Sequence, residues 1–338
     1  LVYLGQAACR RRVPPVLVVR AGRAHRLPVH LPAGEEFTAR LDLEGEGVLD
    51  LAHTQEGKVK EIDGARVQAS EVLLPESMPL GWHEVRVSVT GGATHTMPLV
   101  VAPQRLELPD FLEDEGEQAW GTMTQLYAMR STESWGTGDL ADLADLAAWS
   151  AGLGADFVLV NPLHAAEAAP PMEPSPYLPT TRRFVNPIYI RVEDVPEVDY
   201  LSAAERQLVE WFADDAQRYL DVDRLERDAV WSAKEAALRL VFRQGRSVRR
   251  QRALHDFVDR EGQGLVDFAT WAVLFGIHGP DWREWPAELR DPRSEAVAAF
   301  RDEHTEQVEF QCWMQWILAE QLAAVQRDAV AAGMRLGV

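Results

Sequence analysis

Residues 122–161 read TMTQLYAMRSTESWGTGDLADLADLAAWSAGLGADFVLVN, and this stretch decides the fold of the second part of the chain. It opens with an apolar segment at 122–129 that predicts a buried strand, and it closes with the uninterrupted apolar segment FVLVN at 157–161. Between them, Asp139 precedes apolar residues spaced for one face of a helix, which Gly152 would end. A strand, a helix and a second strand predict a parallel β-α-β unit.

Upstream of this unit the sequence is β-rich. Short apolar stretches recur with turn-forming residues between them, at 16–19, 37–43, 47–53, 70–75, 82–89 and 97–102. In the stretch from 82, Val85, Val87 and Val89 alternate with polar residues, the period of a strand with one solvated face. About seven such strands predict an all-β sandwich, which we place at residues 1–105. For Trp82, a sugar platform is one interpretation, and a core position at a strand start is the one we favour.

Downstream of the sandwich, the stretch LELPDFLEDEGEQ at 106–118 is acidic. We expect a solvated linker at 106–119 rather than a contact tail. After FVLVN, a Pro-rich segment runs from 162 to about 200, and a long loop after a barrel strand is expected to carry function. Helical sequence is expected from about 202 to 275, and a last helix from about 294 to 332.

The final residues, MRLGV at 334–338, predict the start of a third parallel strand. A full (β/α)8 barrel needs about 250 residues, whereas this region includes a helical insertion at about 202–292. A third strand with no neighbour would leave an uncovered edge. We therefore expect an α/β fold class in which residues 120–338 are the first part, with three strands, of a TIM-type barrel in a longer protein.

The composition excludes several partners. The 338 residues carry 34 Lys and Arg against 53 Asp and Glu, a formal net charge of −19. We therefore expect neither nucleic acid nor an anionic membrane as partner, because both attract a net positive face. The sequence has no apolar run of about 18 residues, so no transmembrane helix is predicted.

Cysteine usage and the N-terminal residues indicate a compartment. Cys9 and Cys312 form neither a disulfide framework nor a metal-binding pattern, and Cys312 lies in apolar helical sequence that predicts a buried thiol. In the opening LVYLGQAACRRR, the basic residues follow the apolar ones, the reverse of a secretory signal. We expect a cytoplasmic protein with no metal centre.

Five longer motifs carry a resemblance to a known family: QLYAMRSTESWGTGDLADL (125–143), GADFVLVNPLHA (154–165), SPYLPTTRRFVNPIYI (175–190), GPDWREWPAELRDP (279–292) and FQCWMQWILAEQL (310–322). They closely resemble 4-α-glucanotransferases of the amylomaltase or disproportionating-enzyme family. The resemblance covers about 120–338, with the motifs in the family's order. The β-rich N-terminal region is similar to sandwich modules that some bacterial members carry before the barrel.

The resemblance implies a retaining transglycosylase that holds a glycosyl unit of an α-1,4-glucan on an Asp and passes it to another glucan or glucose. Two carboxylates share this chemistry, one as nucleophile and one as acid and base, and no cofactor is needed. The family's acids follow later barrel strands, beyond Val338, so we assign no catalytic residue here. An α-1,4-glucan or maltooligosaccharide is the implied partner, and the oligomeric state stays open.

The candidate substrate-binding residues are Ser175, Tyr177, Asn161 and His164. The resemblance implies that Ser175 and Tyr177 line the sugar subsite next to the scissile bond, and the alternative is an ordinary Pro-flanked turn. A Tyr offers an aromatic face and a Ser offers a donor and acceptors. Asn161 and His164 follow a strand, where barrel sites are built, although a structural His bonded to a carbonyl is the competing interpretation.

Other conspicuous residues favour structural roles. We expect Arg182 and Arg183 to fix a loop through an ion pair rather than to grip a substrate carboxylate, and Asn186 to shape a turn. For Trp135, two interpretations stay open, a platform at the rim of the site and packing within a loop. The arginines between 239 and 252 predict a solvated helix face.

Two other function classes stay open at this point. A non-catalytic α-glucan-binding or interaction protein would fit the sandwich and the missing acids. A related amylase-type glycoside hydrolase or branching enzyme would share this half of the sequence, although SPYLPTTRRF follows the transferase pattern.

Overall fold

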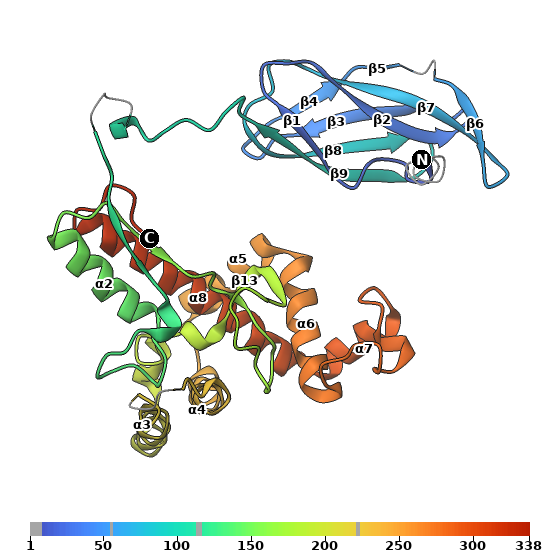
Figure 1. The fold of residues 1–338 in the computed structure, drawn as a ribbon. Helices are drawn as coiled ribbons and strands as arrows, with labels where there is room; N and C mark the ends of the chain where they lie inside the picture. The colour runs from blue at the N-terminus through green and yellow to red at the C-terminus, as the bar shows by residue number, and fades with distance from the viewer. Residues whose placement is uncertain (1–8, 55–56, 113–116, 221–223) are drawn as a thin grey trace. The chain divides into compact units, whose positions relative to one another are not determined.

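The computed structural model describes residues 9–54, 57–112, 117–220 and 224–338. They belong to two compact units, Leu1–Glu115 and Gly116–Val338, and each is described by itself (Figure 1). The N-terminal residues behind our compartment prediction and part of the acidic stretch, at 1–8 and 113–116, lie outside the described residues.

The described part of the first unit contains nine strands: β1 (Leu17–Arg20), β2 (His25–Pro32), β3 (Phe37–Asp42), β4 (Val48–Leu51), β5 (His53–Thr54), β6 (Val59–Ile62), β7 (Ala65–Leu74), β8 (Gly81–Val89) and β9 (Thr94–Ala102). One sheet has the order β1-β9-β8-β3-β4, and the other has β2-β7-β5 with β6 also on β7. Strand β1 runs parallel to β9, and the other pairs are antiparallel. The predicted sandwich is confirmed.

Strand β2 was absent from our sequence expectations, and it contains Pro28 and Pro32, which weaken the sequence signal of a strand. Pro cannot donate to a ladder, but β2 has only β7 as a neighbour, and an edge strand tolerates Pro. Its Leu27, Val29 and Leu31 are buried in the core, which they share with residues of both sheets. The side-chain alternation of the strand therefore outweighs the two prolines.

Trp82 lies on the outer face of β8, and 67% of its surface is exposed. The core position that we favoured was wrong. On the same strand His83, Val85 and Val87 are buried, and side-chain alternation therefore turns Trp82 outward.

The second unit contains four described strands and seven described α-helices: β10 (Gly121–Thr124), β11 (Phe157–Val160), β12 (His164–Ala165), β13 (Thr181–Val185), α2 (Leu140–Gly152), α3 (Ala203–Gln217), α4 (Arg227–Phe242), α5 (Val248–Glu261), α6 (Gln263–His278), α7 (Glu295–Glu303) and α8 (Thr305–Ala331). The predicted helix after Asp139 is α2. The Asp139 carboxylate accepts from the N–H of Ala141 at 3.0 Å and of Asp142 at 3.3 Å, so the expected N-cap is confirmed.

The parallel pair β10–β11 is covered on one face. Helix α2 packs on that face, where Val158 is buried. On the other face Met123 and Leu159, which lie opposite each other, are 73% and 55% exposed. The prediction of a buried strand at 122–129 was therefore wrong for this face.

The end of the chain lies beside β11. Gly337 forms a parallel bridge with Phe157, and the Val158 N–H donates to the Gly337 carbonyl at 2.9 Å. The Arg335 Nε donates to the Asp156 carboxylate at 2.5 Å and holds this segment in place. A single bridge is less than a strand, so the third barrel strand stays a prediction.

Several boundaries differ from those expected. Strand β10 ends at Thr124, and Leu126–Ala128 form a 3-10 turn instead of continuing it. The Pro-rich segment contains the antiparallel pair β12–β13. The expected last helix is divided into α7 and α8 at His304, whose backbone leaves the helical conformation with φ −108° and ψ 31°.

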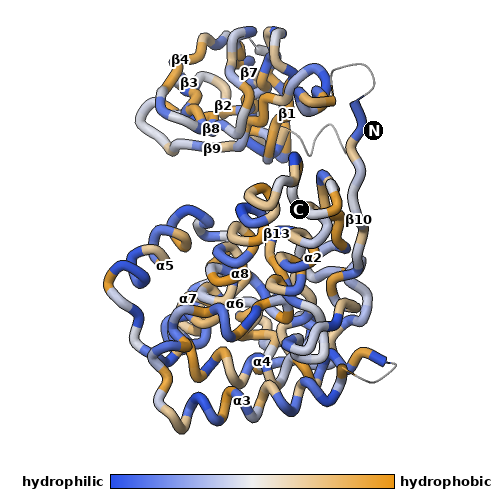
Figure 2. Tube along the Cα trace, turned by 90° about the vertical axis from the view of Figure 1, so that its left-hand side faces the viewer, coloured by the Kyte–Doolittle hydropathy of each residue, from blue (hydrophilic) through white to orange (hydrophobic). Residues whose placement is uncertain are grey.

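Helix α8 forms the centre of the second unit and contacts α2, α5 and α6. Its Trp313 and Ile317 are buried in the core, whereas α5 is mostly hydrophilic (Figure 2). Cys312 is buried as expected, and burial raises the pKa of its thiol to about 12. Among the described residues, no helix combines the length and apolarity needed to cross a membrane.

Candidate substrate-binding site

A small cavity lies where the segments after β10 and β11 meet. Tyr127 and Thr137 reach it from the segment after β10, and His164 and Ser175 reach it from the segment after β11. Ligands of parallel α/β folds bind at the carboxyl ends of the strands. The cavity holds about 20 Å³, enough for about one water molecule and too small to enclose a sugar ring, so its lining residues offer a floor and not an enclosed pocket.

The Ser175 turn presents Tyr177 beside this floor. The Tyr177 N–H donates to the Ser175 Oγ at 3.3 Å, and the Ser175 N–H donates to the Glu173 carboxylate at 3.1 Å. Both bonds fix a local turn, as Ser and its neighbours commonly do. Tyr177 is 60% exposed, so more than half of the residue is accessible.

Asn161 joins the two segments instead of facing the cavity. Its Oδ1 accepts from the Leu126 N–H at 2.7 Å, and its Nδ2 donates to the Pro162 carbonyl at 2.9 Å and to the Tyr189 hydroxyl at 3.3 Å. Both amide hydrogens are therefore engaged. Tyr189 is buried, and burial raises the pKa of its hydroxyl.

The nearby residues with expected structural roles behave as follows. The Asn186 Oδ1 accepts from the Ile188 N–H at 3.1 Å, which confirms the turn. Arg183 donates to the Glu261 carbonyl at 2.7 Å and lies 3.8 Å from its carboxylate, so it fixes the loop. Trp135 is fully buried and donates to Glu193 at 2.8 Å, which excludes a rim platform.

A buried ionic network behind the cavity was missed by our sequence reasoning. The Arg191 Nε donates to Asp139 at 2.7 Å, and its Nη2 donates to Asp142 at 3.2 Å. Ser131 and Ser134 each donate to Asp142 at 2.7 Å. The helix cap at Asp139 is therefore also an ion pair that ties α2 to the segment after β13.

Lys234 completes this network from α4. Its fully buried ammonium donates to the carbonyls of Ile188 at 2.7 Å and Ile190 at 3.0 Å, and lies 3.8 Å from Asp139. Burial lowers the pKa of Lys234. The only sequence signal was a lysine in the otherwise apolar face of a helix. The network holds the turn that carries Tyr189 and Asn186, both of which line the cavity.

Two further charged residues at the cavity were also missed. Glu173 lines it from the Pro-rich segment, and Arg227 lines it from the start of α4 with its guanidinium 5.2 Å from the Tyr127 ring centre. Both lie far from the strand ends in sequence, so no local pattern places them there.

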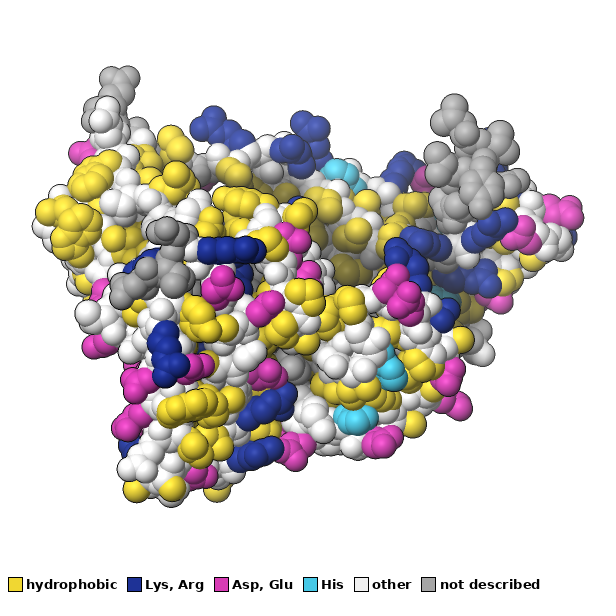
Figure 3. Space-filling model, turned by 60° about the horizontal axis from the view of Figure 1, so that its bottom comes forward, with side chains coloured by type: hydrophobic (Ala, Val, Ile, Leu, Met, Phe, Trp, Pro, Cys, Tyr) yellow, Lys and Arg dark blue, Asp and Glu magenta, His cyan; other side chains and the backbone are white. Residues whose placement is uncertain are grey.

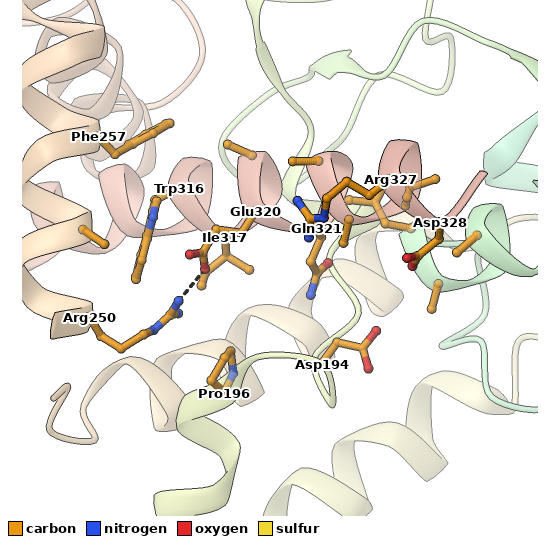
Figure 4. A pocket seen from close by; sticks show the side chains of 18 of the residues that line it. Asp194, Pro196, Arg250, Phe257, Trp316, Ile317, Glu320, Gln321, Arg327 and Asp328 are labelled. Carbon is orange, nitrogen blue, oxygen red and sulfur yellow. Dashed lines mark hydrogen bonds and ion pairs between the residues drawn. The ribbon is translucent and has the colours of Figure 1, made fainter. Parts of the chain in front are cut away.

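A larger groove of about 860 Å³ lies between α2, α5 and α8 (Figure 4). Arg250 crosses it, donating to Glu320 at 2.6 Å, and stacks 4.0 Å from the Trp316 ring centre. None of the four candidate substrate-binding residues lines this groove.

The arginines between 239 and 252 are not simply a solvated face. Arg246 pairs with Glu309 at 2.7 Å, and Arg250 pairs with both Glu320 and Glu197; both arginine side chains are largely buried. On the face shown in Figure 3, basic and acidic side chains are interspersed. Within the described ranges, no three His, Cys, Asp or Glu side chains are grouped to hold a metal ion.

Comparisons with known proteins agree with a β-sandwich followed by an α/β unit. Residues 124–338 match the family described as 4-alpha-glucanotransferase, and residues 12–103 match the MalQ N-terminal beta sandwich domain. The chain therefore belongs to the 4-alpha-glucanotransferase family.

Individual relatives extend over most of the chain. A 4-alpha-glucanotransferase of Mycobacterium tuberculosis is 44% identical over 97% of this chain and 46% of its own length. One of Haemophilus influenzae is 29% identical over 88% of this chain and 44% of its own length. The chain thus spans about half the length of these relatives.

Solved structures give the same picture. The crystal structure of amylomaltase from Corynebacterium glutamicum covers 98% of this chain and 45% of its own, with a TM-score of 0.78 and 38% identity. Amylomaltase from Streptococcus agalactiae in complex with acarbose covers 64% of this chain and 42% of its own. Its TM-score of 0.53 at 17% identity shows a shared fold.

Proposed function

We propose that these residues belong to a 4-α-glucanotransferase that moves a segment of an α-1,4-glucan to another glucan or to glucose. A carboxylate attacks the anomeric carbon and forms a glycosyl ester, while an acid protonates the departing glucan oxygen. The acceptor 4-hydroxyl then attacks the ester and gives its proton to that same residue, now a base. We place these carboxylates outside the 338 residues and assign no catalytic residue within them.

One observation carries the proposal: the cavity lined by Ser175 and His164 lies at the carboxyl ends of two parallel strands. In our proposal Ser175 and Tyr177 contact a glucosyl unit, Tyr177 through its ring face. His164 donates or accepts a hydrogen bond at the same sugar. Asn161 acts as a positioning residue because its amide hydrogens are already engaged.

The finer architecture is also a proposal. We propose a sandwich module at 1–105, a linker at 106–119, and the first part of a (β/α)8 barrel at 120–338 with a helical insertion at about 202–292. The exposed face with Met123 and Leu159 would then point into the barrel interior. From the cysteine usage, we also propose a cytoplasmic location.

Maltotriose disproportionation tests the function. A longer protein that contains these residues is incubated with maltotriose, and glucose and longer maltodextrins are both expected as products. Tyr177→Ala should lower kcat/KM for maltotriose by about tenfold, as loss of one substrate contact of about 1.4 kcal/mol would. Glucose without longer products would favour a hydrolase, and binding without turnover would favour a non-catalytic glucan-binding protein.

A further inference from the structure

An aromatic cleft opens between β13, α6 and the segment at 279–292. We name it the Trp282 cleft and define it by six of its lining residues: Phe184, Asp267, Phe268, Trp271, Trp282 and Trp285. Its volume is about 480 Å³, inside the range of about 300–1,000 Å³ typical of ligand pockets. It shares no lining residue with the cavity at Ser175.

The floor of the cleft is a row of nearly parallel aromatic rings. Phe184 and Phe268 stack with ring centres 4.6 Å apart and planes at 21°, and Phe268 and Trp271 with centres 5.9 Å apart and planes at 23°. Trp282, on the segment that follows α6, is 51% exposed. The cleft therefore has a packed aromatic floor and an accessible indole at its rim.

The charged groups of the cleft are already engaged with the protein. Arg301 lies 3.6 Å from Asp267, and Arg183 lies 3.8 Å from Glu261. The Arg290 Nε donates to a backbone carbonyl at 2.8 Å. These contacts hold the side chains in place without using all five N–H donors of each guanidinium. Aromatic faces beside such hydrogen-bond donors suit a ligand with apolar C–H faces and many hydroxyls.

We propose that the Trp282 cleft is a second α-glucan-binding site, an inference that rests on the proposed function. The loop that carries Tyr177 bounds both sites, because Pro179 lines the Ser175 cavity and Thr180 lines the cleft. A glucan is a polymer, so a chain held in the cleft keeps its other units near the transfer site at raised effective concentration.

Fluorine NMR of the 338-residue chain labelled with 5-fluorotryptophan tests this proposal. The Trp282 and Trp82 signals are assigned by single Trp→Phe variants, and maltoheptaose is titrated. A saturable shift of the Trp282 signal is expected. Trp82, which is also exposed but belongs to the sandwich, serves as the control, and its signal should not shift. By calorimetry, Trp282→Ala should weaken maltoheptaose binding by about tenfold, the equivalent of about 1.4 kcal/mol, and Trp82→Ala should not.

The outcomes separate the inference from the proposed function. No shift at Trp282 with millimolar maltoheptaose overturns the inference. So does a dimer that Trp282→Ala dissociates in sedimentation, since a second copy would then occupy the cleft. If the Trp282 signal does not shift but Tyr177→Ala still weakens maltoheptaose binding, the inference fails and the proposed sugar contact stands. If Trp282 responds and Tyr177→Ala changes nothing, the cleft stands and that contact fails.

Discussion

The sandwich buries the apolar faces of its strands, whereas the parallel strand pair leaves one apolar face exposed. In β8, Val85 and Val87 are fully buried between two sheets. In β10 and β11, Met123 and Leu159 lie side by side on a face that no described element buries. An antiparallel sandwich completes its core from neighbouring strands, whereas a parallel sheet depends on segments far away in sequence. The first unit is therefore self-sufficient in its core, and the second is not.

Arg191→Met should give the largest effect in this comparison. It leaves Asp139 and Asp142 without their buried guanidinium partner, which costs about 3–5 kcal/mol. Urea unfolding followed by tryptophan fluorescence measures the loss, because all tryptophans except Trp82 belong to the second unit. Arg243→Met, which breaks an exposed pair with an acceptor 3.8 Å away, is the matched control and should cost less than about 0.5 kcal/mol. Equal losses of unfolding free energy in the two variants would contradict our inference that burial makes the Arg191 network stabilising.

Leu99→Ala should destabilise the sandwich alone. Leu99 is fully buried in β9, and truncation of such a residue costs about 2–5 kcal/mol through lost burial and a cavity. The fluorine signal of 5-fluorotryptophan at Trp82, the one tryptophan in Leu1–Glu115, follows the first unit, while tryptophan fluorescence follows the second. Val18→Ala, on the outer face of β1, should stay within about 0.5 kcal/mol. A parallel shift of both transitions would show that the units are energetically coupled.

Met123→Lys sharpens the comparison at the open face. In the 338-residue chain the substitution should change the free energy of unfolding by less than about 0.5 kcal/mol, because the side chain is mostly exposed. In a longer protein with a closed barrel, the same lysine would be buried and cost several kcal/mol, about the size of an unpaired buried charge. Val158→Lys, on the face against α2, is the control that should be costly in both. Equal tolerance of Met123→Lys in both lengths would count against the barrel interior.

Asp156→Asn should have the smallest effect and a distinct pH dependence. The hydrogen bond from Arg335 lowers the pKa of Asp156, so its stabilisation is complete above its unfolded pKa of about 3.8 and fades as pH falls through the lower folded pKa. The difference in melting temperature between wild type and Asp156→Asn should therefore be largest near neutral pH and shrink below pH of about 4. Asp302→Asn, an exposed acid on α7, serves as control. A difference that grows on acidification would rule out this role for the Arg335 pair.

Local signals in the sequence predicted much of the fold. Asp139 before an apolar stripe gave the N-cap of α2, and the alternation of Val85 and Val87 gave β8. These features succeed because a cap and a strand face depend on residues within one or two turns. Where a local signal was misleading, as with the prolines of β2, the position of the strand in its sheet had overridden it.

The candidate site was less accessible to sequence reasoning. Ser175 was a candidate through the family resemblance and His164 through its position after a strand, and the cavity is lined by both. Lys234 and Arg191 were missed because their partners come from α2 and from the turn at Ile188, more than forty residues away. The predicted core position of Trp82 was wrong because the local sequence does not indicate which face of a strand is covered.

The sequence by itself determined the two-part organisation, the β-α-β order, the N-cap at Asp139 and the membership of a family through its long motifs. Only the tertiary structure decided which faces are covered, which charges are buried together, and that an aromatic cleft flanks the Tyr177 loop. The physical reason is the distance along the chain over which each feature is determined. Caps and alternation are set by neighbours along the chain, whereas burial and ion pairing are set by neighbours in space, which folding selects from distant segments.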